Sequence, residues 1–244
     1  MNVHFIIHEA YEGPGAFQTW IKDNGFIATS TKVYLGEPLP LDNTYIDLLI
    51  VLGGPQCPET TREECHYFKV DEEIKFIKSC IEKDKAIVGV CLGAQLIGEA
   101  LNASFEKSPN KEIGYFPIEL TSFGVEHPKF SHFNQHEVVG HWHNDMPGLT
   151  SKCNIIASSL GCPRQIVEYS NLIYGFQCHL EFTSKSLNKL IEVCSEVFDD
   201  IDNQSYVQKP KSIIESSSLQ MNSLLYEFMD KLTLEYTSIT TKLK

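Results

Sequence analysis

The chain has 244 residues, 42% of them hydrophobic, which is enough to bury a sizeable core and too apolar for a disordered protein. Its formal net charge of −12 argues against nucleic acid and anionic membranes as partners, because both carry negative charge. The first nine residues lack the basic and long apolar segments of a signal peptide, and no apolar run reaches transmembrane length.

The first half of the chain predicts strands that alternate with helices. Apolar runs at residues 3–8, 27–34 and 46–52 predict strands, and the last run is continuous, as in a parallel strand covered on both faces. Apolar residues at helical spacing predict one helix over 16–24 and a second one marked by Val70, Ile74, Ile77 and Ile81. This alternation predicts an α/β fold with a doubly wound, flavodoxin-like, mostly parallel sheet and helices on both faces.

The second half predicts further strands, partly antiparallel, that extend this sheet. They are expected at residues 112–121, 137–143, 154–158, 165–169 and 172–178. Thr183 predicts the N-cap of a helix with apolar residues from Leu187 to Val197.

A polar break at 199–203 separates this region from a last helix. The apolar face of that helix carries Met221, Leu224, Leu225, Phe228 and Leu232, and the tail from Glu235 onward is expected to be frayed. We therefore expect one domain at 1–198 and a C-terminal helical extension at 199–244 that packs on the same domain. Packing of the same face on a second subunit, in a homodimer, is the alternative.

The stretch Ala86–Gln95 carries the strongest chemical signal. A β-branched apolar run ends in Gly89-Val90-Cys91-Leu92-Gly93, and a helical sequence follows. The order Gly-x-Cys-x-Gly is typical of a nucleophile elbow, a sharp strand–turn–helix that needs small residues beside the nucleophile. The N-terminus of the following helix favours the thiolate, which is the reactive form of cysteine. A cysteine alone would more often be a buried core residue, and the two glycines favour the elbow.

A base and a group that orients it are expected downstream. In the segment Phe176-Gln177-Cys178-His179-Leu180-Glu181, His179 and Glu181 project to the same side of an extended backbone. The carboxylate can hold one imidazole nitrogen while the other faces the thiol. A structural histidine is the alternative for His179 alone, and the upstream elbow favours catalysis.

These motifs together resemble the class I glutamine amidotransferases, whose triad is Cys-His-Glu. The resemblance covers roughly residues 3–185, from the segment at 8–15 and the Gly53-Gly54-Pro55 loop to the Gln-Cys-His-Leu-Glu motif, and is closest to free-standing members related to the glutaminase domain of GMP synthase. Segments 111–115 and 140–145 are also similar to that subgroup. Leu180 stands where many members have proline, but leucine can adopt the same extended conformation.

The resemblance implies a role for each residue of the site. Cys91 would attack the side-chain amide of glutamine, His179 would act as base and then acid, and Glu181 would orient His179. The backbone N–H groups of Gly54 and Leu92 would form the oxyanion hole. Gln95 and His143 are expected to bind the substrate.

His141 and His143 are two apart on a predicted strand and share a face. A metal site would need at least one more ligand, and the sequence indicates none, so we expect neither a metal nor another cofactor.

Two enzymatic functions and one non-enzymatic function remain open at this point. The first is a glutaminase that passes ammonia to a separate synthetase or acceptor subunit, since the chain has no Gly-x-x-x-x-Gly-Lys-Ser/Thr loop for ATP. The second is a stand-alone hydrolase or peptidase of γ-glutamyl compounds. A regulatory protein on this fold would be expected to lack a triad member, and none is missing. The eight cysteines form no Cys-x-x-Cys pair and indicate reduced thiols in a cytoplasmic protein.

Overall fold

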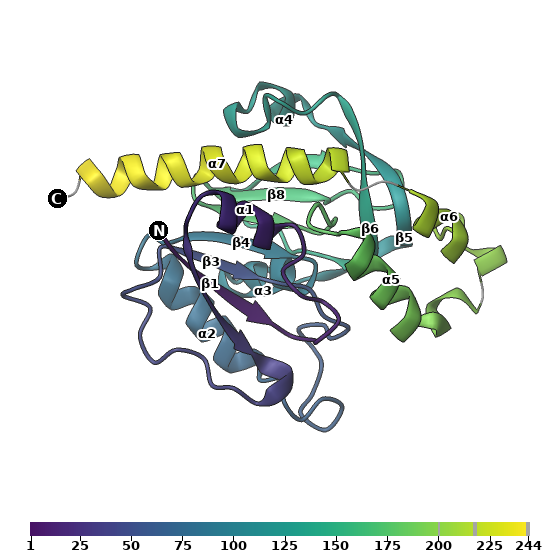
Figure 1. Ribbon diagram of the computed structural model, residues 1–244, viewed down its shortest axis with the longest axis horizontal. Helices are drawn as coiled ribbons and strands as arrows, with labels where there is room; N and C mark the ends of the chain where they lie inside the picture. Colours follow the sequence, from purple (N-terminus) through teal and green to yellow (C-terminus); the bar gives the residue numbers. More distant parts are fainter. Residues whose placement is uncertain (200, 217–218, 243–244) are drawn as a thin grey trace.

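The computed structural model describes residues 1–199, 201–216 and 219–242, without the side chain of residue 202, and this part of the chain contains one mixed sheet of nine strands (Figure 1). Five strands pair in parallel in the order β2, β1, β3, β4 and β9. Their bounds are β1 Asn2–Ile7, β2 Ile27–Lys32, β3 Leu48–Val51, β4 Ala86–Val90 and β9 Ile173–Phe176. The doubly wound α/β fold predicted from the sequence is thereby confirmed.

Four strands extend the sheet beyond β9, and each pairs antiparallel with its neighbour in the order β8, β7, β5 and β6. Their bounds are β5 Glu106–Leu120, β6 His136–Met146, β7 Asn154–Ser158 and β8 Ile166–Ser170. The expected start of β5 at residue 112 is wrong, because the strand begins at Glu106. Its polar first residues show no apolar pattern, and an irregularity in the pairing between Lys107 and Glu112 separates them from the rest of the ladder.

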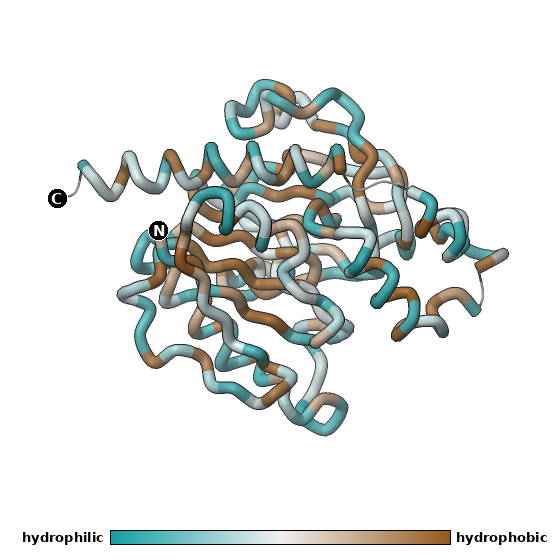
Figure 2. Tube along the Cα trace, in the orientation of Figure 1, coloured by the Kyte–Doolittle hydropathy of each residue, from teal (hydrophilic) through white to brown (hydrophobic). Residues whose placement is uncertain are grey.

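Helices cover both faces of the sheet, and strand β9 shows which helix lies on which face. Tyr174 and Phe176 contact Phe228 of α7 (Leu219–Lys242), with ring centroids 5.0 Å apart in each pair. A Cβ built on Gly175, between them, would lie 3.0 Å from Ala94 of α3 (Leu92–Ala100). Because successive residues of a strand face opposite sides, α7 and α3 cover opposite faces. Figure 2 shows the hydrophobic residues concentrated along the central strands between them.

The remaining helices complete the two layers. Helix α1 (Phe17–Asp23) is joined to α7 by a hydrogen bond of 2.7 Å from Trp20 Nε1 to Asp230, and α2 (Val70–Ile81) packs on α3. Short helices fill the connections: η1 Val33–Leu35, α4 Ser122–Glu126, η2 Pro128–Phe130, α5 Ser184–Val193, η3 Ser195–Phe198, η4 Ile201–Asn203 and α6 Pro210–Glu215. Thr183 caps α5 as expected, but the helix does not continue to Val197, because Cys194 has a non-helical backbone conformation.

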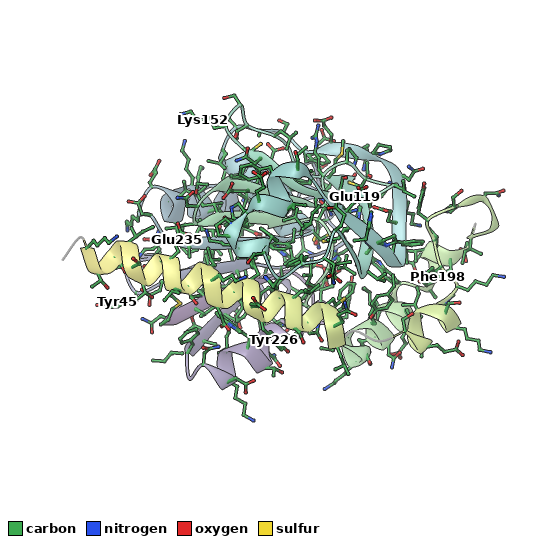
Figure 3. All side chains as sticks on the ribbon, turned by 90° about the horizontal axis from the view of Figure 1, so that it is seen from above. Tyr45, Glu119, Lys152, Phe198, Tyr226 and Glu235 are labelled. Carbon is green, nitrogen blue, oxygen red and sulfur yellow. The ribbon has the colours of Figure 1, made fainter. Side chains whose placement is uncertain are left out.

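Helix α7 is longer than the sequence indicated. It continues to Lys242, so the expectation of a frayed tail from Glu235 is wrong. Tyr236 is buried, and its hydroxyl donates to Asp47 at 3.3 Å, which ties this end of the helix to the parallel part of the sheet. In Figure 3 the helix lies along the near side of the molecule, with Tyr226 and Glu235 labelled on it. Residues 200, 217–218 and 243–244 of the expected extension 199–244 lie outside the described residues.

Among the described residues, no helix has both the length and the apolar character needed to cross a membrane.

The aromatic contacts of Phe228 predict that α7 stabilises the whole domain. Its ring lies 5.1 Å from that of Phe130 and 5.0 Å from those of Tyr174 and Phe176. Phe228→Ala should lower the free energy of unfolding by about 3–5 kcal/mol, because it leaves a cavity between helix and sheet. The matched variant Leu234→Ala, on the same helix at a position 72% exposed, should change it by less than about 0.5 kcal/mol. Urea denaturation of both variants tests this, and equal losses would contradict it.

Candidate active site

Cys91 lies at the turn between β4 and α3, in a conformation that few residues adopt. Its φ of 52° and ψ of −111° indicate a strained backbone. A Cβ on Gly93 would clash with the carbonyl of Val51, and one on Gly89 would clash with the backbone of Gly93. The geometry is therefore that of the nucleophile elbow, and it requires small residues on both sides of the cysteine. Cys91 is 7% exposed.

His179 and Glu181 reach Cys91 because of strand pairing. Strand β9 runs parallel to β4 with Phe176 opposite Val90, so both strands leave the sheet at the same edge. Cys91 follows β4 directly, and His179 follows β9 after two intervening residues. The Nδ1 atom of His179 lies 2.7 Å from Glu181 Oε1.

Three contacts fix the orientation of His179. Its ring stacks on Phe182 with centroids 4.1 Å apart and planes 8° apart. Its backbone N–H donates to the carbonyl of Gly140 in β6 at 2.8 Å, and Glu181 holds Nδ1. Among the described residues, the Nε2 atom of His179 has no hydrogen-bond partner, which leaves it available to the thiol of Cys91. Although burial opposes charge on the ring, Glu181 and Cys91 raise the pKa of His179 to about 10. Glu181 therefore stabilises the protonated, imidazolium form of His179.

The loop that contains Gly54 is held in place by His8. The Nδ1 atom of His8 lies 3.1 Å from the carbonyl oxygen of Leu52 and 3.2 Å from that of Gly53, and its Nε2 lies 2.7 Å from Glu73. Carbonyls and carboxylates accept hydrogen bonds, so this arrangement suits a doubly protonated ring. Burial opposes that charge, but Glu73 raises the pKa of His8. The second predicted oxyanion donor, Leu92, is the first residue of α3 and follows Cys91 directly.

A cavity of about 250 Å³ lies beside Cys91. Of the residues predicted for the site, Gly54, Cys91, Gln95 and His143 line it, and His179, Glu181 and Leu92 do not. Trp142 also lines it, and its carbonyl lies 3.8 Å from the sulfur of Cys91. The structure thus brings the predicted binding residues to one hollow at the carboxyl ends of the parallel strands, where open α/β sheets bind ligands.

Glu12 is a residue of the site that the sequence reasoning missed. A Cβ built on Gly53 would lie 2.5 Å from the Glu12 carboxylate, 3.4 Å from Cys91 Cβ and 3.5 Å from His179 Cε1, so all three side chains surround one point. Burial raises the pKa of Glu12 to about 7, although the nearby His179 and His8 oppose this. The segment from residue 8 to 15 carried a signal, since it forms part of the family resemblance, but nothing in it indicated which residue reaches the nucleophile.

Glu112, His141 and His143 form a buried cluster next to the cavity. Glu112 Oε2 lies 3.3 Å from His143 Nε2 and 3.8 Å from His141 Nδ1, so the expectation that the histidines lack a third metal ligand is wrong. The β5–β6 pairing, which places Glu112 opposite His143, was not visible in the sequence. The same oxygen also accepts from Ser159 Oγ at 2.9 Å and Gln165 Nε2 at 2.6 Å. Hydrogen bonds thus occupy the oxygen that a metal ion between the imidazoles would need.

Comparison with known proteins agrees with this fold. The sequence profile described as glutamine amidotransferase class-I matches residues 28–194, so the chain belongs to the class I glutamine amidotransferase family. Over 237 residues it is 45% identical to the glutamine amidotransferase-like protein YfeJ of Salmonella typhimurium, which covers 97% of this chain and 99% of that protein. The crystal structure of SMU.1228c superposes with a TM-score of 0.94 at 43% identity, over 96% of this chain and 100% of that one. A glutamine amidotransferase from Thermotoga maritima, 21% identical over 95% of this chain and 97% of its own, shares the fold with a TM-score of 0.83.

The raised pKa of Glu12 predicts a pH-dependent stability. The folded protein binds the Glu12 proton more tightly than the unfolded chain does, so the stability that this proton provides is present below the ordinary pKa of 4.5 and is lost as the pH rises through about 7. Glu12→Gln, which stays uncharged, should therefore gain stability relative to the wild type between pH 5 and pH 8, measured as the urea midpoint. The exposed Glu63→Gln is the matched control and should show the same difference at both pH values. A Glu12→Gln variant that loses relative stability as the pH rises would contradict the assignment.

Proposed function

We propose that this protein hydrolyses the side-chain amide of glutamine through a thioester on Cys91, and that the released ammonia passes to an acceptor on a separate subunit. The observation that carries the proposal is the arrangement of Cys91 on a strained turn beside His179, whose Nδ1 is held by Glu181 at 2.7 Å. Membership of the class I glutamine amidotransferase family supports the same substrate.

The first half of the reaction forms the thioester. The sulfur of Cys91 attacks the side-chain carbonyl carbon of glutamine, and the resulting oxyanion is stabilised by the N–H groups of Gly54 and Leu92. When the carbon–nitrogen bond breaks, His179 gives its proton to the departing nitrogen, and ammonia leaves. The raised pKa of His179 supports this step, because the ring already carries the proton that ammonia needs.

The second half releases glutamate. His179, now neutral, takes a proton from water, which attacks the thioester carbon. The carbon–sulfur bond breaks, and Cys91 leaves as the thiolate while His179 is again an imidazolium. Throughout, Glu181 holds Nδ1 and stabilises the charged ring, as the third member of a triad does. Gln95 and His143 line the cavity and are placed to contact the rest of the substrate.

Loss of the nucleophile is the direct test of this mechanism. Cys91→Ala should lower the release of ammonia and glutamate from L-glutamine by about 10⁴-fold or more, as triad deletions do in other hydrolases. His179→Ala should cause a comparable loss, and the combination should be little worse than either variant alone. Cys153→Ala removes a thiol that does not line the cavity and is the matched control, with a rate expected to equal the wild type. Unchanged turnover in Cys91→Ala would exclude Cys91 from the mechanism.

A panel of γ-glutamyl compounds tests the choice of substrate. L-Glutamine should be hydrolysed with a higher kcat/KM than γ-glutamyl peptides or γ-glutamyl amines, in a Cys91-dependent way. Faster turnover of another γ-glutamyl compound would instead identify a stand-alone hydrolase. If the isolated chain hydrolyses none of these compounds, covalent labelling by a glutamine-like electrophile distinguishes the remaining possibilities. Modification of Cys91 would indicate a glutaminase that needs its partner, and absence of modification would contradict the proposal.

A further inference from the structure

Gln177 lies beside the proposed nucleophile and has no role in the mechanism above. It follows β9 directly, is fully buried, and its backbone N–H donates to the carbonyl of Gln165 at 2.8 Å. Gln177 precedes His179 by two residues, in the bent segment through which the chain leaves β9.

The side-chain amide of Gln177 contacts the sulfur of Cys91. Its Nε2 atom lies 3.3 Å from Sγ. An amide N–H can only donate, and a thiolate can only accept, so this contact stabilises the charged form of the nucleophile. Both residues are buried, at 0% and 7% exposure, and water therefore competes little with this hydrogen bond.

The same contact fixes the orientation of Gln95. With the nitrogen of Gln177 directed at the sulfur, its oxygen faces Gln95 and accepts a hydrogen bond of 3.2 Å from Gln95 Nε2. The side-chain oxygen of Gln95 takes no part in this hydrogen bond. It is buried and, among the described residues, has no hydrogen-bond partner, while the residue itself lines the cavity beside Cys91.

We propose that Gln177 is a further catalytic residue, which donates a hydrogen bond to the Cys91 thiolate and, through Gln95, presents a hydrogen-bond acceptor to the substrate. The part that concerns the substrate rests on the proposed function, and the part that concerns the thiolate does not. The substrate group that meets Gln95 must be a donor, which glutamine supplies as its carboxamide N–H or its α-ammonium group. A ligand that offers only an acceptor there leaves the buried oxygen unpaired and binds less tightly.

Alkylation of Cys91 by iodoacetamide at a series of pH values tests the first part without any turnover. Because the chain has eight cysteines, the modified Cys91 peptide is quantified by mass spectrometry. Gln177→Leu should move the midpoint of the alkylation profile up by about one pH unit and slow the reaction about tenfold at pH values below the wild-type midpoint, as expected for the loss of a hydrogen bond to a charged group. Gln135→Leu removes an exposed glutamine that does not line the cavity, and should match the wild type.

A variant of the same shape covers the case in which Gln177→Leu does not fold. In Gln177→Glu an ionised carboxylate replaces the amide, so it offers no donor and repels the thiolate. The midpoint of the alkylation profile should then rise by at least one pH unit relative to the wild type. A profile unchanged from the wild type in either folded variant would overturn the proposal.

Gln95→Leu tests the second part. Alkylation of Cys91 should stay within about twofold of the wild type, because Gln95 does not touch the sulfur, while KM for glutamine should rise about tenfold. An unchanged KM would overturn the role given to Gln95. Absence of glutamine turnover in every variant would count against the proposed function and leave the alkylation result to decide the role of Gln177.

Discussion

The parallel pairing of β4 with β9 is the constraint on which the site depends. These strands are far apart in sequence, and their register puts Val90 opposite Phe176. Both strands therefore end at the same edge of the sheet. At this edge β4 is followed by the turn of Cys91, and β9 is followed by the segment that carries His179 and Glu181. A shift of one residue in this register would turn the side chains of β9 to the opposite faces of the sheet and would displace the segment that carries His179 relative to Cys91, because side chains alternate.

The site also contains buried ionisable groups, and each buried imidazole lies next to a carboxylate of opposite charge. His179 faces Glu181, and His8 faces Glu73, each pair at 2.7 Å. Neither imidazole would hold a proton at neutral pH in a buried position without its carboxylate. The raised pKa of Glu12 has the opposite origin, since burial outweighs the two histidines near it. The site therefore holds both a stable imidazolium and a carboxyl group that titrates near neutral pH.

The sequence predicted those parts of the fold and site that are encoded locally. The elbow around Cys91 and the alternation of His179 and Glu181 depend on neighbouring residues, and the strands of the parallel sheet are continuous apolar runs. Glu12 and Glu112 reach the site only through tertiary packing and strand pairing, which leave no local pattern. Helix α7 was recognised by its apolar face, but its extent was not, because the contact that orders its end is made with Asp47 in a distant part of the chain.

The C-terminal helix matters for the site as well as for the core, although the family profile ends at residue 194. Asn222 of α7 donates from Nδ2 to the carbonyl of Leu180 at 2.7 Å and to that of Phe182 at 2.9 Å. These carbonyls flank Glu181, whose own carbonyl accepts from the N–H of Ala16 at 2.8 Å. The segment that carries the base lies beyond the end of β9, where an isolated antiparallel bridge pairs His179 with Gly140 of β6. Hydrogen bonds from the two ends of the chain add to this bridge, and the geometry of His179 therefore depends on the correct docking of α7.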